Sequence, residues 1–294
     1  MAKNSAANEN SHFPETSAHR HPVSDSVALR IHSDTKPHNM KIANLQKGLI
    51  LLYKGVEVIG EGTGFGVPIA KYMNETVFSG SSSLHVRTFE NIVEIQKEFV
   101  MDLVIRDTLR NLKLENPKIR TLLDYISTLY KKQYQSHVLF ARSVLLARSL
   151  LFKFGIKSTF KRDTQKGVVV VKYTIERNRV LVNIDFSLLE RTNLSKIFIL
   201  NEQGAQFFRT YSDSESLQLN DEEIGAWNDV TSQSAKITNE QERIGFCLKN
   251  IEGAKLRRGR ELIIGSLNWI GLDYELGAEY SNFEYEIEVL GATV

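Results

Sequence analysis

Four glycines alternate with larger residues early in the chain, and this feature most constrains the fold. Gly60, Gly62, Gly64 and Gly66 lie in the run from Val58 to Pro68. In an extended strand successive side chains point to opposite faces, so this spacing would leave one face bare over four positions. Glycine inside a strand marks a bulge, a bend or a place where another group approaches the backbone. We expect that group to be a ligand or an aromatic ring from a neighbouring element.

Strand-like segments lie on both sides of a helical block. Alternating or short apolar runs, bounded by turn residues, fill 45–95 and 156–292. Between Ile119 and Tyr130 the apolar residues instead recur every three or four positions, which is typical of an amphipathic helix. The pattern predicts a mainly β (α+β) fold: a large antiparallel β-sandwich or open barrel with a helical insertion of two to three helices over 99–155.

The chain divides into four expected segments. Residues 1–40 are rich in Ser, Asn, His and Pro and hold few large apolar residues, which predicts a disordered tail. Residues 41–98 form the N-terminal β-meander, 99–155 the helical insertion, and 156–294 the C-terminal antiparallel part of the same domain. Most of the seven histidines lie in the tail, widely spaced and without cysteines beside them, so we predict no metal site. No cofactor motif is identified.

The charge is small but uneven. At 294 residues and 42% hydrophobic composition the chain can bury a real core, and its net charge of +2 does not indicate a nucleic-acid partner. Basic residues dominate between Lys97 and Arg162, and acidic residues between Glu202 and Arg243. The single cysteine excludes an intrachain disulfide and fits a reducing compartment. Without a signal-like apolar segment or a long uncharged apolar run, we expect a cytoplasmic protein with no membrane span.

The glycine run invites comparison with the glycine-rich loop of protein kinases. Gly64 is an extra residue that breaks the spacing of that loop. Kinases also need a mainly helical lobe downstream, whereas this chain continues in strand-like segments to its end. The sequence therefore does not support a kinase.

An acidic segment, Asp221 to Asp229, is the best catalytic candidate. It places three adjacent carboxylates and Asp229 beside Trp227. Paired carboxylates cleave glycosidic bonds when their environments separate their pKa values, and an aromatic ring suits a sugar. We assign Glu222, Glu223 and Asp229 as catalytic candidates. A solvated acidic turn anchored by Trp227 is the structural alternative.

A second aromatic and acidic group lies near the C-terminus. Trp269, Asp273, Tyr274 and Glu275 alternate as they would in a strand. Half-buried sheet residues have this pattern without any ligand. We therefore assign this group to the sheet rather than to a site.

The residues expected to bind a ligand lie at the glycine run and at the end of a strong apolar strand. Functional residues often follow such strands. The candidates are Gly62, Gly64, Phe65, Asn201, Glu202 and Trp227. The first hypothesis is binding of a polar small molecule or carbohydrate-like ligand near the glycine-rich strand. The alternatives are a glycosidic-bond hydrolase or lyase using the 221–229 segment, and a scaffold that binds a partner through the basic helical insertion.

Overall fold

The structure, a computed structural model, describes residues 18–32, 46–73, 75–89, 92–107, 159–225, 227–263 and 267–291. Regular structure in these ranges is almost entirely β, together with a short 3-10 helix, η2 (Asp221–Ile224). The first strands are β1 (Ala18–Pro22), β2 (Val27–His32), β3 (Ile50–Tyr53), β4 (Val56–Glu57), β5 (Gly64–Tyr72), β6 (Glu75–Thr88) and β7 (Ile92–Asp107). Beyond residue 158 follow β8 (Thr159–Glu176), β9 (Arg179–Asp185), β10 (Leu194–Gln203), β11 (Thr210–Asp213), β12 (Gln218–Asn220), β13 (Asn228–Asp229), β14 (Ser234–Asn239), β15 (Ile244–Lys249), β16 (Lys255–Ile263), β17 (Leu267–Gly277) and β18 (Asn282–Leu290).

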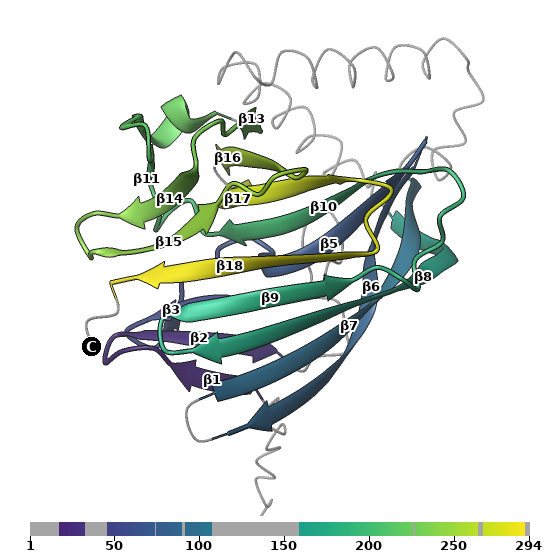
Figure 1. The fold of residues 1–294 in the computed structure, drawn as a ribbon, viewed down its shortest axis with the longest axis horizontal. Helices are drawn as coiled ribbons and strands as arrows, with labels where there is room; N and C mark the ends of the chain where they lie inside the picture. Colours follow the sequence, from purple (N-terminus) through teal and green to yellow (C-terminus); the bar gives the residue numbers. More distant parts are fainter. Residues whose placement is uncertain are drawn as a thin grey trace, which may run out of the picture.

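The strands form two antiparallel sheets (Figure 1). The larger has fourteen strands in the order β12-β11-β14-β15-β18-β9-β8-β7-β6-β5-β10-β17-β16-β13, and the smaller has the order β1-β2-β3-β4. This confirms the predicted large antiparallel β architecture.

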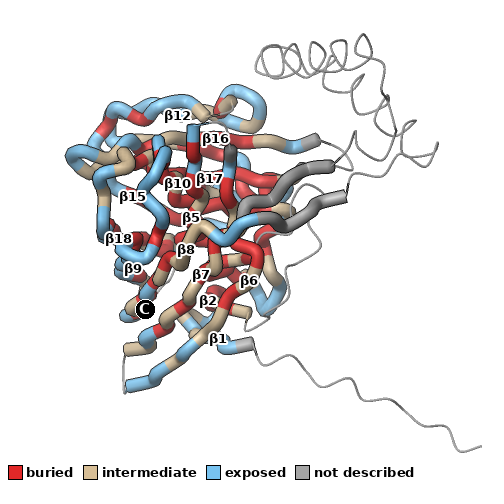
Figure 2. The backbone as a smooth tube through the Cα atoms, turned by 90° about the vertical axis from the view of Figure 1, so that its right-hand side faces the viewer, coloured by how far each residue is buried: buried red, intermediate tan, exposed pale blue. Residues whose placement is uncertain are grey.

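The large sheet bends over on itself at β6. The first residues of β6 pair with β5, whereas the strand from Val77 to Thr88 pairs with β7. Three tyrosine hydroxyls then bridge strands that are far apart in the sheet order. Tyr173 of β8 donates to the Phe65 carbonyl of β5 at 2.8 Å. Tyr285 of β18 donates to Asn201 Oδ1 of β10 at 2.6 Å, and Tyr274 of β17 donates to the Lys249 carbonyl of β15 at 2.6 Å. We call β7, β8, β9, β18, β15 and β14 the first layer, and β5, β10, β17 and β16 the second layer. Buried positions concentrate between the layers (Figure 2).

The alternation of the sequence decides which side chains enter the core. In β9 every second residue is buried, and Val180, Val182 and Ile184 are fully inside. The residues between them are exposed, as expected for a sheet with one face on the core and one in water.

The expected disorder of residues 1–40 is wrong for residues 18–32. β1 and β2 form a hairpin, and β2 pairs with β3. Val27, Leu29 and Ile31 of β2 are fully buried in the main core. Their alternation is too short to stand out in a polar segment, but burial of three branched side chains offsets the entropy of ordering them. The remaining residues of this segment lie outside the described ranges.

The helical insertion is wrong for residues 99–107, which continue strand β7. Phe99 and Met101 are fully buried and pair in register with Val169 and Gly167 of β8. The rest of the predicted helical segment, to residue 155, lies outside the described residues. In the described ranges no helix has the length and apolar character needed to cross a membrane.

The glycine run is not one extended strand. Its backbone turns around residue 60, and β5 begins only at Gly64. Gly60, Gly64 and Gly66 have φ values of 55°, 84° and 76°, which place them in the left-handed region that favours glycine. The alternation therefore reports a turn and an irregular strand rather than a bare sheet face.

Candidate functional site

Protein atoms, rather than open space, lie against the glycines of the run. A Cβ on Gly66 would lie 2.8 Å from the Tyr173 hydroxyl, and a Cβ on Gly64 would lie 2.8 Å from the Leu49 carbonyl oxygen. The neighbour of Gly66 is thus an aromatic ring, one of the two expected groups. Phe65 lies inside the core, with its ring centroid 5.1 Å from that of Phe246.

Close packing of the glycine run positions the end of β10. Gly64 is opposite Glu202 in the β5–β10 register, next to a bulge between Leu200 and Asn201. The Asn201 side chain lies in the core, where Oδ1 accepts the Gly66 N–H at 3.0 Å and the Tyr285 hydroxyl. A Cβ on Gly62 would lie 2.9 Å from the Glu202 carbonyl oxygen. Four predicted ligand residues, Gly62, Gly64, Asn201 and Glu202, are therefore brought together.

Glu202 and Asp273 form a buried carboxylate pair. Glu202 is 6% exposed and accepts the Thr63 N–H through Oε2 at 3.2 Å. Asp273 is 2% exposed and accepts the Asn201 N–H through Oδ1 at 2.8 Å. Within the described part of the chain, its other oxygen, Oδ2, is buried without a hydrogen-bond partner.

Burial changes the protonation of both acids. Loss of water raises the pKa of Glu202 to about 7, and a smaller upward push comes from Glu261. Burial and the Glu202 charge hold the pKa of Asp273 well above its usual range, opposed by the Asn201 N–H and Arg257. Near neutral pH the pair therefore retains protons that exposed carboxylates would have released.

The pair faces away from the core, because Tyr274, the next residue of β17, points into it. Two glycines, Gly271 of β17 and Gly259 of β16, lie opposite each other on this outer side of the second layer. A Cβ on Gly271 would lie 3.0 Å from Glu202 Cγ, and a Cβ on Gly259 would lie 3.0 Å from Trp269. Because the two glycines have no side chains, Glu202 and Trp269 can pack directly against the strand backbone.

Two indoles pack against the backbone at Gly259. Trp227 and Trp269 stack with ring centroids 4.6 Å apart and an interplanar angle of 16°. Trp227 has a φ of 56°, a costly conformation for a bulky residue, and its backbone nitrogen would lie 3.1 Å from a Cβ on Gly259. Glu202, Asp273, Trp227, Trp269 and Arg257 are called the carboxylate–tryptophan site below.

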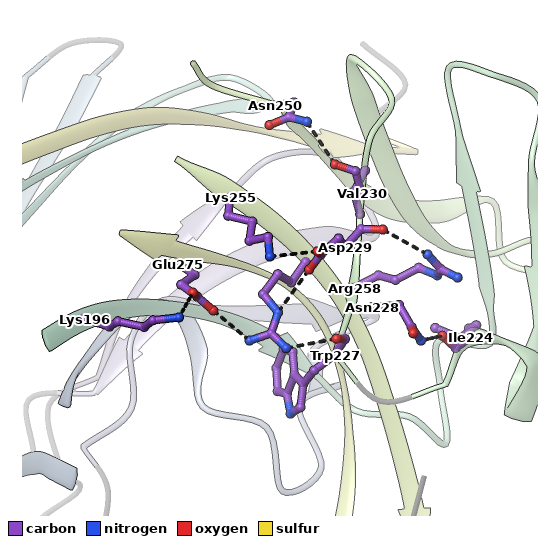
Figure 3. Close-up of polar contacts among 11 residues, drawn as sticks. Lys196, Ile224, Trp227, Asn228, Asp229, Val230, Asn250, Lys255, Arg258 and Glu275 are labelled. Carbon is purple, nitrogen blue, oxygen red and sulfur yellow. Dashed lines mark hydrogen bonds and ion pairs between the residues drawn. The ribbon is translucent and has the colours of Figure 1, made fainter. Parts of the chain in front are cut away.

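Arg257 joins the parts of this site. It lies opposite Asp273 in the β16–β17 register. Its guanidinium donates to the Trp227 carbonyl at 2.9 Å and to Glu275 at 3.1 Å, and its Nε lies 3.7 Å from Asp229 Oδ1 (Figure 3). One side chain therefore contacts Trp227 and the two outer carboxylates, and its charge acts on the buried Asp273.

Lysines form the exposed rim. Lys255 pairs with Asp229 at 2.8 Å, and Lys196 pairs with Glu275 (Figure 3). About half of each lysine side chain is exposed, so these pairs contribute little to stability. Across the described ranges, no group of three or more His, Cys, Asp or Glu side chains could hold a metal ion.

The three predicted catalytic residues separate. Asp229 reaches the rim of the carboxylate–tryptophan site through Arg257 and Lys255. Glu222 and Glu223 are exposed on η2, where Glu223 accepts the Asn220 N–H at 3.0 Å and so caps the helix. In the described structure no hydrogen bond or ion pair joins either of them to the site.

Sequence reasoning missed Asp273, Trp269 and Arg257 as site residues. Asp273 and Trp269 alternate as ordinary strand residues do. The available signal was Gly271 between them, because a glycine within a strand marks close approach of another group. Only the register of β16 on β17 places Arg257 beside Asp273 and Gly259 beside Gly271.

No family model matches the chain, and no curated protein matches it. Among solved structures it is similar to the α-N-acetylgalactosaminidase NagBb from Bifidobacterium bifidum, in complex with GalNAc, with a TM-score of 0.46, 8% identity, and coverage of 94% of this chain and 36% of that one. It is also similar to the Slr1438 protein from Synechocystis sp. PCC 6803 (TM-score 0.37, 6% identity, 99% of each chain) and to a beta-arabinopyranosidase (TM-score 0.34, 7% identity, 94% of this chain and 40% of that one). The chain thus spans little more than a third of the two glycosidases. Similarity at this level carries no inference about its chemistry.

Proposed function

We propose that the protein binds a polar, carbohydrate-like ligand at the carboxylate–tryptophan site, beside the glycine run. The observation that carries this proposal is Asp273 Oδ2, a buried carboxyl oxygen without a hydrogen-bond partner among the described residues. Leaving such a group unpaired costs roughly 1–3 kcal/mol, and folded proteins satisfy the great majority of them. A ligand hydroxyl that accepts a hydrogen bond from the protonated Asp273 carboxyl at Oδ2 removes that cost.

The chemistry of the surrounding groups favours a sugar over other small molecules. A sugar ring presents hydroxyls, which both donate and accept, around an apolar C–H surface. Carboxylates accept from hydroxyls, the Arg257 guanidinium donates to them, and indoles offer apolar area with a polar N–H. The site therefore offers the three kinds of contact that a sugar ring uses.

Access to the pair depends on Arg257. Its side chain is 22% exposed and binds Glu275, Asp229 and the Trp227 carbonyl. In this proposal the ligand hydroxyls replace some of these contacts, and the guanidinium turns to the ligand.

A hydrolase or lyase acting on a glycosidic bond is the second candidate. The observation that favours it is the pKa of Glu202, raised by burial to about 7, because a carboxylic acid still protonated near neutral pH can act as a general acid. In this second candidate Asp229, which contacts Arg257 at the rim of the site, is the second carboxylate.

The test is retention of the full chain on a panel of immobilised glycans, followed by calorimetric titration with the best ligand. Asp273→Asn and Glu202→Gln should each weaken binding about tenfold or more, because each changes a buried group that faces the ligand. Glu252→Gln, which alters an exposed turn carboxylate, should bind like the parent. Folded Asp273→Asn and Glu202→Gln proteins with the parent's affinity would refute the site.

The same samples separate binding from catalysis. Release of new reducing ends from the bound glycan, abolished in Glu202→Gln and reduced in Asp229→Asn, supports the enzyme. Tight binding with no release after prolonged incubation supports a binding protein.

A further inference from the structure

The carboxylate–tryptophan site has more carboxylates than cations. Two carboxylates are buried in it and two lie at its rim: Glu202 and Asp273, and Glu275 and Asp229. Within the described part of the chain, the cations that contact these carboxylates are Arg257, Lys196 and Lys255. A further carboxylate, that of Glu261, pushes the pKa of Glu202 upward. The site therefore has an excess of negative charge wherever its acids are ionised.

Salt bridges at the rim occupy all three cations. Each lysine pairs with one rim carboxylate, and the guanidinium of Arg257 contacts both, at 3.1 Å from Glu275 and 3.7 Å from Asp229 (Figure 3). The charge of Arg257 also acts on Asp273. In the described structure, however, no cation donates a hydrogen bond to Asp273 or Glu202. The uncompensated negative charge therefore lies at the buried pair.

Asp273 provides independent evidence for a ligand at this pair. Its side chain is 2% exposed, and its Oδ1 accepts the Asn201 N–H at 2.8 Å, but among the described residues its Oδ2 has no hydrogen-bond partner. A hydroxyl at Oδ2 would form the hydrogen bond and leave the repulsion between Asp273 and Glu202 in place. An ammonium at Oδ2 supplies the donor and the opposite charge together, which gives the stronger contact.

The indole beside the pair is already in contact with a cation. Trp269 stacks on Trp227, and the guanidinium carbon of Arg257 lies 5.8 Å from the Trp227 ring centroid. Aromatic faces attract cations, and the same rings offer apolar area to the C–H side of a sugar. A uronic acid, by contrast, would bring another carboxylate to an acidic site. These contacts favour a sugar ring that carries an amine.

We propose that the ligand of the carboxylate–tryptophan site is an amino sugar, with its ammonium on Asp273 Oδ2 and its ring beside the indoles. This inference rests on the proposed function, for which it names the class of ligand. Binding is coupled to proton release. The O–H bond of a protonated carboxyl of the pair breaks, its proton passes to the buffer, and the ammonium keeps its three protons.

The experiment is calorimetric titration of the full chain at pH 6 with three β-1,4-linked tetramers that differ only at C2. They are the chitosan tetramer, with an ammonium, the chitin tetramer, with an acetamide, and cellotetraose, with a hydroxyl. The chitosan tetramer should bind about tenfold or more tightly than the other two, as expected for a charge-assisted hydrogen bond. Titration in phosphate and in MES, which differ in ionisation enthalpy, should show proton release with the chitosan tetramer alone.

Two variants assign this preference to the site. Asp273→Asn should reduce the preference for the chitosan tetramer over cellotetraose to less than about threefold and abolish proton release. Glu284→Gln, which neutralises an exposed carboxylate of β18 on the first layer, should bind the chitosan tetramer within twofold of the parent. The comparison of buffers uses the parent protein, so it tests the proposal even where Asp273→Asn does not fold.

Several results would overturn the inference. They are equal affinity for the chitosan tetramer and either neutral tetramer, binding of the chitosan tetramer without proton release, and equal affinity of folded Asp273→Asn and the parent for it. No binding of the chitosan tetramer at millimolar concentration would also overturn it. The proposed function survives each of these results if another glycan still binds the parent and loses affinity in Asp273→Asn. It fails together with the inference if no glycan binds the folded parent.

Discussion

The two outer faces of the sandwich use the same strand periodicity with opposite results. On the first layer, outward residues such as Lys172 and Asn183 stand in water between buried neighbours. On the second layer, Glu202 and Asp273 also alternate outward, yet both are buried. The difference lies in the glycines: the Glu202 side chain packs against the backbone of Gly271, and the two indoles pack against the backbone of Gly259. Alternation therefore decides the direction of a side chain, and its neighbours decide whether water reaches it.

The largest expected effect is on the glycine run that supports the second face. Gly64→Val should destabilise the protein by roughly 3 kcal/mol or more, because the residue has a φ of 84° and its Cβ would lie 2.8 Å from the Leu49 carbonyl oxygen. Urea denaturation followed by circular dichroism measures this loss.

Gly55→Ala is the matched control for backbone strain alone. Gly55 has a φ of 82°, but a Cβ there would meet nothing within 4 Å. Its cost should be only about 1 kcal/mol. Equal losses in the two variants would show that close packing of Gly64 contributes nothing.

The buried pair should give stability that falls as pH rises. The pKa of Glu202 is raised from 4.5 to about 7, so the folded state keeps a proton that the unfolded chain releases. Its contribution is complete below about pH 4.5 and is lost as pH rises to about 7, by on the order of 3 kcal/mol. Thermal unfolding across this range should show the slope in the parent and a flatter profile in Glu202→Gln.

Glu57 provides a control of opposite sign. A hydrogen bond with His32, helped by Arg30, lowers its pKa to about 2. Its contribution is present above about pH 4.5 and is lost as pH falls toward 2. Glu57→Gln should therefore flatten only the acidic side of the profile. A parent that is equally stable at pH 5 and pH 7.5 would contradict the protonated pair.

Removal of the Arg257 guanidinium should cause the next largest loss in the free energy of unfolding. Arg257→Gln breaks the contacts to Glu275, Asp229 and the Trp227 carbonyl, and leaves each of the two carboxylates with only its exposed lysine partner. We expect a loss of roughly 2 kcal/mol at pH 7, measured by urea denaturation. Lys255→Gln removes only an exposed ion pair with Asp229 and should cost less than about 1 kcal/mol. Similar costs would mean that Arg257 acts merely as a surface charge.

The sequence predicted the antiparallel sheet class and part of the second face. Glycine spacing and the polar end of an apolar strand pointed to Gly64, Asn201 and Glu202, which do converge. The sequence did not predict Asp273 and Arg257 as site residues. Nothing local distinguishes Asp273 from an ordinary strand residue until its register with Arg257 is known. The β1–β2 hairpin was not predicted for a related reason. Three buried residues of β2 are enough to stabilise it, because β3 supplies the rest of the apolar contact.

The smallest expected effect lies on the regular first face, where the alternation alone predicts the outcome. Asn183 of β9 is exposed, and its hydrogen bond to Glu284 competes with water, so Asn183→Ala should change stability by less than about 0.5 kcal/mol. Val182, the preceding residue, is fully buried, and Val182→Ala should cost about 2 kcal/mol through lost contacts and the cavity left behind. Urea denaturation of these two variants compares the free energy of unfolding that an exposed and a buried residue contribute in the same strand. A loss above 1 kcal/mol in Asn183→Ala would show that its hydrogen bond to Glu284 stabilises the first layer, as the polar contacts of the carboxylate–tryptophan site stabilise the second. The contrast between the two faces would then rest on burial alone and not on their polar contacts.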